Sequence, residues 1–330
     1  MRSFWKELLL RLERGPACLV SILSSTGSTP RGAGAVMAVF PDGACLGTIG
    51  GGNVEYAAQR LAAGLLARGE NALQSFRFLQ GDAASLGMVC GGEVQLHFHA
   101  LSPGDADILR RLEDPSDTGL WLLRRLKGAE VREMRVVSGA DRAEPEIQPL
   151  LREQAVFQAD GWFSLPAGRP GLVYLFGGGH VSQALAALLG RTGFRCVVLD
   201  DRPEFADPAR FPAAEQVLLC DFDRLELSIT PWDYIVIMTR GHQADYEVLT
   251  QTLHSGAKYI GCIGSRAKLD LCRRRLLENG FTPEEYSRLH APIGLNIGAQ
   301  TPEEIAVAVA AELIAVRAGA AIQPQWEGHI

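Results

Sequence analysis

The clearest chemical feature of the sequence is a glycine-rich turn between an apolar run and a helical pattern. The apolar residues 172–176 are followed by Gly177-Gly178-Gly179-His180, and helical spacing continues over 180–191. The first glycine permits a tight turn, and Gly179 allows a pyrophosphate to approach backbone N–H groups at the start of the helix. Ser182 stands where this fingerprint usually has a third Gly or Ala. The pattern predicts a nucleotide-binding turn, and the alternative is a similar turn that binds no ligand.

Two acidic residues support the nucleotide interpretation. Asp200 and Asp201 end the next predicted strand, about 20 residues further on, where an acidic side chain can bind ribose hydroxyls. Arg202 follows directly, and a nearby arginine can instead accept a 2′-phosphate. The sequence therefore leaves the choice between NAD and NADP open.

A second glycine-rich turn lies in the first half of the chain. Gly50-Gly51-Gly52 leads from a predicted strand into a helix that carries Glu55. Such a turn exposes N–H groups at a helix N-terminus and can bind an anion. The loop over 24–34 contains Arg31, whose guanidinium could lie beside that anion. The alternative is a plain tight turn between a strand and a helix.

Cys90 is the cysteine whose neighbours suggest reactivity. It directly precedes Gly91-Gly92 on a predicted loop, where a thiolate could bind a soft metal or take part in sulfur chemistry. A lone cysteine is more often inert. The chain has seven cysteines and no Cys-x-x-Cys pair, which argues against a disulfide framework and a zinc knuckle.

Three further loops of the second half contain candidate residues: 239–242, Gly264-Ser265-Arg266 and 290–294. We expect them at the carboxyl edge of a parallel sheet, where doubly wound folds bind ligands. His242 could act as an acid, a base or a ligand, and a structural histidine is the alternative. Ser265 could simply cap the helix that follows.

The elements that would position these residues divide into two domains. Residues 1–165 mix strands and helices, residues 166–171 form a Pro/Gly-rich linker, and residues 172–330 alternate strand and helix patterns. That alternation predicts a mainly parallel, doubly wound sheet. The strands expected in it are 172–176, 195–199, 216–220, 234–238 and 258–263, with helices over 180–191, 244–254, 266–279 and 302–317. Thr282 and Thr301 each begin a capping-box pattern at the start of a helix.

The composition excludes several classes of protein. The chain of 330 residues is 47% hydrophobic and 21% charged, with a net charge of −6 and no basic stripe, so we expect no nucleic-acid partner. No apolar run reaches the roughly 18–20 residues of a membrane span. The helix predicted over 1–11 contains charges, unlike a secretory signal. We therefore expect a cytoplasmic protein without a membrane partner.

Taken together, these motifs resemble the XdhC/CoxI family, the accessory factors of xanthine dehydrogenase and related molybdenum hydroxylases. The resemblance covers almost the whole chain and rests on long ordered strings. These strings are 27–31, 47–55, 90–93, 176–180, 200–203, 259–266 and 291–299. Two residues depart from the family pattern: Arg240 replaces the usual His before Gly-His, and Ser182 replaces the usual Gly.

The resemblance implies an N-terminal α/β domain of the XdhC type, a C-terminal Rossmann-like domain and a molybdenum-cofactor chaperone, not an independent catalyst. It implies binding of molybdopterin or its dinucleotide form, sulfuration with a cysteine desulfurase, and delivery to an apo molybdenum hydroxylase. The cofactor phosphate would suit the N–H-rich turns, and Cys90 would be the molybdenum contact. The other candidate cofactor residues are Arg31, Gly50, Gly51, Gly52, Glu55, Gly91, Gly92, Gly177, Gly178, Gly179, His180, Asp200, Asp201, Arg202, Gly264, Ser265 and Arg266. We also expect a homodimer.

Two alternatives from other classes stay open. An NAD(P)-dependent oxidoreductase would use the same Gly177 turn, with His242 as its catalytic candidate, although the sequence shows no assignable Lys/His/Tyr pattern. A nucleotide-sensing scaffold would bind at that turn without transferring any cofactor.

Overall fold

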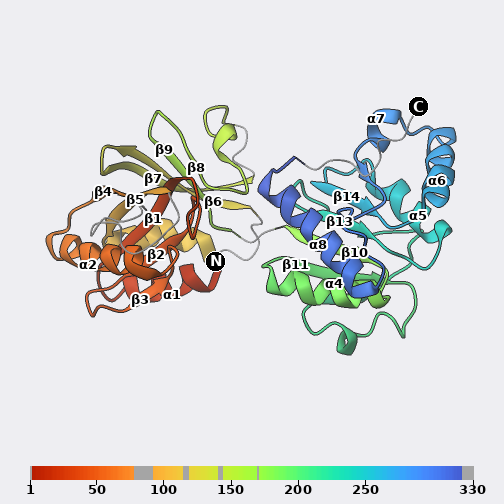
Figure 1. Cartoon of the computed structure of the whole chain (residues 1–330), viewed down its shortest axis with the longest axis horizontal. Coiled ribbons are helices and arrows are strands. Elements are labelled where there is room, and N and C mark those ends of the chain that lie inside the picture. Colours follow the sequence, from red (N-terminus) through yellow and green to blue (C-terminus); the bar gives the residue numbers. More distant parts are fainter. Residues whose placement is uncertain (1, 78–91, 114–118, 140–143, 169–170, 322–330) are drawn as a thin grey trace. The chain divides into compact units, whose positions relative to one another are not determined.

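The computed structural model describes residues 2–77, 92–113, 119–139, 144–168 and 171–321. The chain divides into two compact units, residues 1–169 and 170–330, shown from red to yellow-green and from green to blue in Figure 1. Each unit has its own hydrophobic core.

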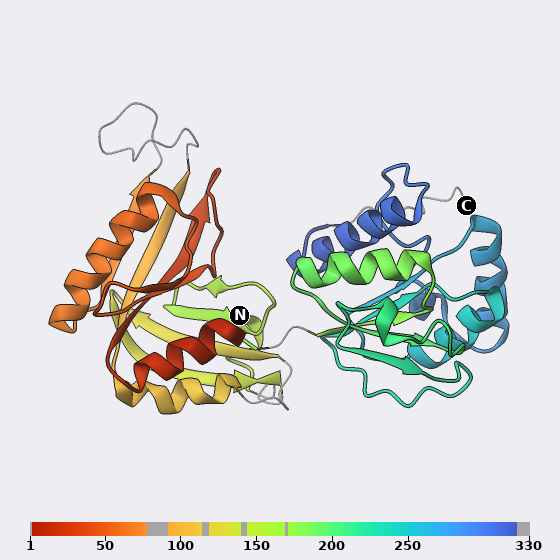
Figure 2. The same ribbon diagram turned by 90° about the horizontal axis from the view of Figure 1, so that it is seen from below.

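The first unit contains an antiparallel sheet in the order β3-β2-β1-β5-β4. Helix α2 packs on one face of this sheet, and α1 belongs to the core on the opposite face (Figure 2). Strands β2 and β3 pair as an antiparallel hairpin on either side of Asp42. The bounds are α1 Arg2–Leu12, β1 Ala17–Thr26, β2 Val36–Val39, β3 Cys45–Gly47, α2 Gly52–Arg68, β4 Ala72–Arg77 and β5 Glu93–Leu101.

A second sheet, in the order β7-β6-β9-β8, closes the core on the side away from α2. Its inward side chains join those of α1, β1 and β2 in one apolar cluster. The strands are β6 Leu120–Lys127, β7 Glu130–Ser138, β8 Val156–Phe157 and β9 Trp162–Pro166, with α3 at Ala106–Leu109 and short 3-10 helices at Pro103–Asp105, Arg110–Glu113 and Gln148–Leu150.

One charged side chain of β6 is buried between the two sheets. Arg124 is fully buried and donates to Ser21 Oγ at 2.7 Å, and its Nη1 lies 3.3 Å from His97 Nδ1. Its guanidinium lies over the ring of Phe163 at 5.1 Å. Among the described residues no carboxylate pairs with it. The two sheets are therefore joined by a desolvated cation as well as by apolar contacts.

The second unit is a six-stranded sheet in the order β12-β11-β10-β13-β14-β15, and every neighbouring pair is parallel. Numbered along the chain this is the order 3-2-1-4-5-6 of dinucleotide-binding folds. The predicted doubly wound, Rossmann-like sheet is confirmed. The strands are β10 Leu172–Phe176, β11 Arg195–Asp200, β12 Gln216–Leu219, β13 Tyr234–Ile237, β14 Tyr259–Cys262 and β15 Leu289–His290.

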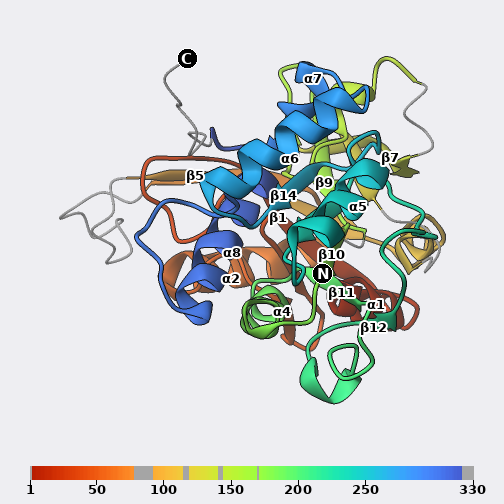
Figure 3. The ribbon, with the colours of Figure 1, turned by 90° about the vertical axis from the view of Figure 1, so that its right-hand side faces the viewer.

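Helices cover both faces of this sheet. Helices α4 and α8 pack on one face and α5 and α6 on the other (Figure 3), because alternate residues of each strand point to opposite sides. Both predicted capping boxes are present, at Thr282 before α7 and at Thr301 before α8. The helices are α4 His180–Arg191, α5 His242–Thr252, α6 Arg266–Glu278, α7 Pro283–Tyr286 and α8 Pro302–Ala318, with a 3-10 helix at Pro208–Arg210.

Within the part of the chain described, no helix combines the length and the apolar character needed to cross a membrane.

Candidate functional site

The three glycines after β10 have different surroundings. Gly177 has a φ of +102°, and a Cβ there would overlap the carbonyl oxygen of Met238. A Cβ on Gly178 would lie 2.5 Å from the carbonyl oxygen of Phe205. A Cβ on Gly179 would have no heavy atom within 4 Å. The first two glycines therefore allow close packing, while the third leaves the turn open to a ligand.

Helix α4 begins at this open turn without a side-chain cap. Gly179 is its N-cap residue and makes no capping hydrogen bond, and the hydroxyl of Ser182 donates back to the carbonyl of Gly177. Helix α5 likewise begins after Gly241 without a side-chain cap. Strands β10 and β13, which precede these helices, are neighbours where the strand order reverses. Two helix N-termini with uncapped N–H groups thus follow neighbouring strands at the same edge of the sheet, an arrangement suited to an anion.

Asp200 acts within the protein rather than facing a ligand. Its side chain is 1% exposed and accepts from the backbone N–H groups of Gly178 (2.6 Å) and Arg202 (2.9 Å). The guanidinium of Arg202 adds two bonds, at 2.9 and 3.0 Å. Burial would raise the pKa of Asp200, but these hydrogen bonds outweigh it and lower that pKa. Asp200 therefore fixes the glycine turn and is not free to bind a ribose.

Asp201 is the more accessible acid of the pair. Its side chain is 46% exposed. Partial burial and the neighbouring Asp200 raise the pKa of Asp201. The sequence allows either acid to contact a ribose. In the structure only Asp201 is accessible enough to do so.

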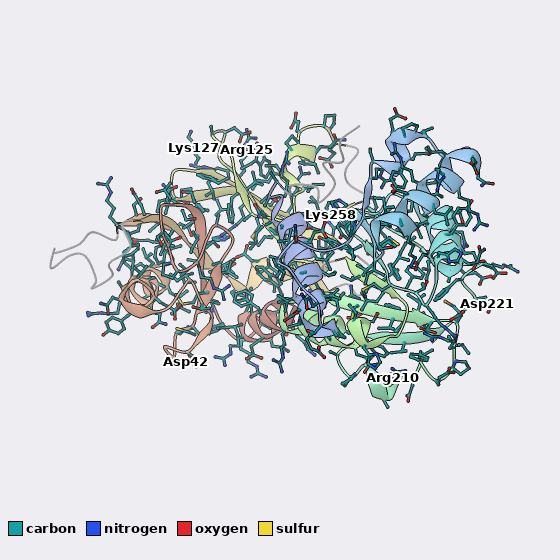
Figure 4. The ribbon with its side chains drawn as sticks, turned by 45° about the vertical axis from the view of Figure 1, so that its right-hand side comes forward. Asp42, Arg125, Lys127, Arg210, Asp221 and Lys258 are labelled. Atoms are coloured by element: carbon teal, nitrogen blue, oxygen red, sulfur yellow. The ribbon has the colours of Figure 1, made fainter. Side chains whose placement is uncertain are left out.

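An aromatic ring with two guanidiniums packs beside the glycine turn. Arg202 lies 3.6 Å and Arg210 4.5 Å from the ring centre of Phe205, whose carbonyl contacts Gly178. Arg210 lies on the segment that follows β11 and donates to the carbonyl of Glu204 at 2.8 Å (Figure 4). This segment thus places two guanidiniums near the turn, together with the carboxylates of Asp201, Glu204 and Asp207.

The loop after β13 contains a network that the sequence interpretation missed. Asp245 is 2% exposed and accepts from Thr239, through its N–H at 3.1 Å and its hydroxyl at 2.5 Å. Its second oxygen pairs with Lys268 of α6. A Thr at the end of a strand and an Asp in the first turn of the next helix are the signal that could have found it. His242, by contrast, is exposed at the start of α5.

Gly264 and Ser265 follow the carboxyl end of β14. Ser265 is the N-cap of α6, with its hydroxyl accepting from the N–H of Lys268 at 3.4 Å. The helix starts at Arg266, whose side chain lies outside the described residues. The capping alternative for Ser265 is thus present, and α6 differs from α4 and α5 in having its N-terminus satisfied.

In the first unit, three motifs that are far apart in sequence lie together. A Cβ on Gly50 would lie 2.9 Å from Cβ of Pro30 and 3.6 Å from Cγ of Arg31. A Cβ on Gly92 would overlap the carbonyl oxygen of Ser28. Arg31 is exposed, with no carboxylate partner in the segments that the structure describes. The loop over 27–31 therefore joins the Gly50 turn to the segment before β5.

The N–H groups of the Gly50 turn already have an internal partner. The carboxylate of Glu55 accepts from the N–H groups of Ile49 (3.0 Å) and Gly51 (3.1 Å) and from the hydroxyl of Thr48 (2.5 Å). Burial would raise the pKa of Glu55, but these bonds lower it overall. The turn thus binds a carboxylate of its own helix, and the guanidinium of Arg31 is the group left for an external anion.

Cys90 and Gly91 lie outside the described residues. Gly92, the next residue, lies against the loop over 27–31. The described residues hold no group of three side chains able to bind a metal ion. Burial raises the pKa of Cys18 to about 12 and that of Cys196 to about 11, so these thiols are protonated packing residues.

Comparison with known proteins matches both units. The model of the XdhC and CoxI family matches residues 10–77, and the model of the XdhC Rossmann domain matches residues 173–313. A crystal structure described as a xanthine dehydrogenase from Bacillus halodurans has the same fold, with a TM-score of 0.73 at 24% identity and 98% of each chain covered.

Three curated relatives align over almost the whole chain. A Bacillus subtilis protein named as a probable subunit of xanthine dehydrogenase is 27% identical over 319 residues, covering 93% of this chain and 94% of that protein. The molybdenum cofactor insertion chaperone PaoD of Escherichia coli is 26% identical over 310 residues, covering 91% and 83%. YqeB of Escherichia coli is 28% identical over 320 residues, but the chain spans only 46% of its length. The chain belongs to the XdhC and CoxI family.

Proposed function

We propose that this chain is an accessory protein that binds the molybdenum cofactor, supports its sulfuration and delivers it to an apo molybdenum hydroxylase of the xanthine dehydrogenase type. The names of two relatives, a molybdenum cofactor insertion chaperone and a probable subunit of xanthine dehydrogenase, support this role. The proposed setting is the cytoplasm, with the chain acting as a homodimer.

The observation that carries the proposal is the open turn at Gly179. The cofactor has a phosphate, extended in some forms to a dinucleotide, and a phosphate binds well to uncapped N–H groups at a helix N-terminus. Helix α4 offers such groups with no side chain over them, and α5 offers a second set on the neighbouring strand. The residues present therefore fit the anionic end of the cofactor. His180, Arg202 and Arg210 would add polar and positive contacts around it.

The first unit holds the candidate residues for a metal contact. Arg31 presents an exposed guanidinium beside Gly50 and close to the loop that contacts Gly92. A positive group of this kind stabilises a thiolate, and a thiolate is a soft ligand suited to molybdenum. Cys90 is the proposed contact, and a cysteine desulfurase is the proposed sulfur donor.

An oxidoreductase that uses NAD(P) is the alternative, and the strand order of the second unit favours it. Asp200 is engaged by Arg202 and Gly178, so only Asp201 would be left to bind the ribose of NAD. Small molecules released from the purified protein separate the two functions. A pterin supports the chaperone role, and a nicotinamide dinucleotide supports the alternative.

Cys90→Ser tests the proposed metal contact. Serine nearly preserves the volume but removes the soft ligand, so the fold should persist while delivery of active, sulfurated cofactor falls. The measurement is the activity of an apo-hydroxylase reconstituted with purified wild-type or variant protein. Cys45→Ser is the matched control, because Cys45 is an exposed free cysteine of the same unit. Full reconstitution by the Cys90 variant would reduce Cys90 to a packing residue.

A further inference from the structure

A pocket of the second unit lies at the carboxyl ends of β14 and β15. It has a volume of about 400 Å³, within the range of small-molecule sites. One wall is Ile263, Gly264 and Ser265, directly after β14. The opposite wall is the segment 292–299, which follows β15 and has no regular structure. The same edge of the sheet carries the Gly177 turn.

The wall combines isoleucine side chains with polar groups, among them the carboxamide of Asn296. Ile263, Ile293 and Ile305 line the pocket, and Ile297 lines it while remaining 55% exposed to solvent. A flat ring placed over Ile297 would remove that apolar surface from water. The carboxamide of Asn296 is exposed at the same pocket and makes no hydrogen bond to another described residue. An amide side chain can donate to and accept from one ligand edge at the same time.

The 292–299 segment is held by a buried carboxylate. Glu312 of α8 is 3% exposed and accepts from the N–H of Gly294 at 2.5 Å and from the hydroxyl of Tyr259 at 2.8 Å. Its other oxygen lies 2.8 Å from Nδ1 of His290. The segment is further fixed by the N–H of Leu295, which donates to the carbonyl of Ala308 at 3.1 Å. These hydrogen bonds hold the 292–299 wall of the pocket in place, and Glu312 is the residue that positions it.

We propose that this pocket binds the pterin ring system of the molybdenum cofactor, with the carboxamide of Asn296 pairing with the amide edge of the pterin and Ile297 covering its face. This inference rests on the proposed function, because it assigns a place to one part of the same ligand. The pterin is a planar heterocycle with adjacent donors and acceptors, which matches a pocket lined by isoleucine side chains and an exposed carboxamide.

The position of the pocket relative to the phosphate turn supports the assignment. Strand β14 is two strands from β10 in the sheet, a separation of about 10 Å. A ligand with its phosphate at Gly179 would extend along the carboxyl edge, past the loop after β13, to reach the pocket. Dinucleotide-binding sheets place the two halves of their ligand on either side of the same crevice.

The experiment uses probes that separate the two ends of the ligand. Free pterin, which lacks a phosphate, tests the pocket through the quenching of its fluorescence as the full chain is added. GMP and CMP test the Gly177 turn by calorimetry. The variants are Asn296→Leu and Ile297→Asn. The control is Ile314→Asn, because Ile314 is another exposed isoleucine of the second unit, on α8 and outside the pocket.

Asn296→Leu and Ile297→Asn should each weaken pterin binding about tenfold. The same variants should leave nucleotide binding unchanged, and Ile314→Asn should change neither. Wild-type-like pterin binding in both pocket variants would overturn the inference. So would a wild-type chain that fails to bind free pterin.

The failures of the two ideas are distinguishable. If the purified protein carries the cofactor and reconstitutes a hydroxylase but the pocket variants do so equally well, the pocket assignment fails and the function stands. If the pocket binds pterin but no cofactor reaches the hydroxylase, the delivery role fails and the pocket assignment stands.

Discussion

At the scale of single residues, the glycines of one turn have separate roles. Gly177 is required by its positive φ and by the backbone of Met238. Gly179 has a φ of −72°, which any residue can adopt, and open space where a side chain would lie. A substitution at Gly179 therefore tests ligand approach, whereas one at Gly177 tests the fold.

Gly179→Val should weaken binding of a nucleotide or dinucleotide cofactor by tenfold or more, because its side chain would block the approach of a phosphate to the start of α4. Calorimetric titration measures the loss, and thermal melting should show a largely intact fold. Gly177→Val is the contrasting variant and should lower the melting temperature strongly. Unchanged nucleotide affinity in a normally melting Gly179 variant would contradict the proposed site.

His99 predicts an acid sensitivity of the first unit. Burial and the charge of Arg124 lower the pKa of His99 to about 2 and that of His97 to about 3. Histidine in the unfolded chain has a pKa near 6.5, whereas both of these histidines stay neutral in the folded unit. Below pH 6.5 the unfolded chain therefore binds protons that the folded unit does not bind. Stability should therefore fall as the pH falls below 6.5, by about 1.4 kcal/mol per pH unit for each of these histidines.

His99→Leu should make this dependence shallower by about 1.4 kcal/mol per pH unit, because it removes one of the two titrating groups. Nδ1 of His99 has no hydrogen-bond partner in the described structure, so leucine breaks no bond of that atom. Urea unfolding at several pH values, followed by the fluorescence of Trp5 and Trp121, measures it. A variant at the exposed His254 is the control. An unchanged slope in His99→Leu would exclude the buried neutral state.

At the scale of elements, the Gly50 turn depends on a carboxylate from its own helix. Glu55→Gln should destabilise the first unit by about 1–2 kcal/mol at neutral pH, because a carboxamide is a weaker acceptor for the N–H groups of Ile49 and Gly51. The folded pKa of Glu55 is lowered from its usual 4.5. Its contribution is therefore present above pH 4.5 and is lost as the pH falls through the lower folded value.

The free energy of unfolding of wild type and of Glu55→Gln should be measured across that pH range. The difference between the two values should become smaller in acid. Glu70→Gln is the matched control, since Glu70 makes an exposed ion pair with Arg68 at the end of the same helix. Its effect should stay within about 1 kcal/mol. If the free energies of unfolding of wild type and Glu55→Gln differ by the same amount at all pH values, the charge of Glu55 is not what stabilises the turn.

Local patterns predicted most of the elements and few of their polar connections. The bounds of β10 and α4 match those expected from the apolar run and helical spacing, because both signals are local. Strand β15 was not expected, since its two residues carry no pattern of their own and pair only through β14. The bonds of Glu312 to Gly294, Tyr259 and His290 join distant segments and depend on tertiary packing, and no spacing rule identifies them.

The residues of the candidate site were likewise predicted only where their pattern is local. The sequence located the Gly177 turn and the acids after β11, because that fingerprint is contained in one βαβ unit. It did not distinguish Asp200, which bonds to Gly178 and Arg202, from Asp201, which is exposed. It also missed Asp245 and Asn296, whose surroundings are formed by segments far apart in the chain.

At the scale of the whole molecule, the two units have separate cores, and no described apolar cluster contains residues of both. Calorimetry should therefore show two unfolding transitions. A nucleotide at about 100 times its Kd should stabilise the second unit by about 2.7 kcal/mol and leave the transition of the first unit unchanged. Gly179→Val should abolish that shift. A single unfolding transition whose midpoint temperature rises with the nucleotide would indicate that the two units unfold together.

The buried guanidinium of Arg124 has a consequence for how the first unit reaches its native state. While the two sheets are apart, this cation is hydrated, and closing them removes its water and replaces it with Ser21 and His97. A partly closed intermediate would have lost the water without gaining the new partners, which is costly for a charge. Such an intermediate should be too sparsely populated to detect. The two sheets are therefore expected to come together in a single kinetic step, with linear chevron arms for this unit and no burst phase.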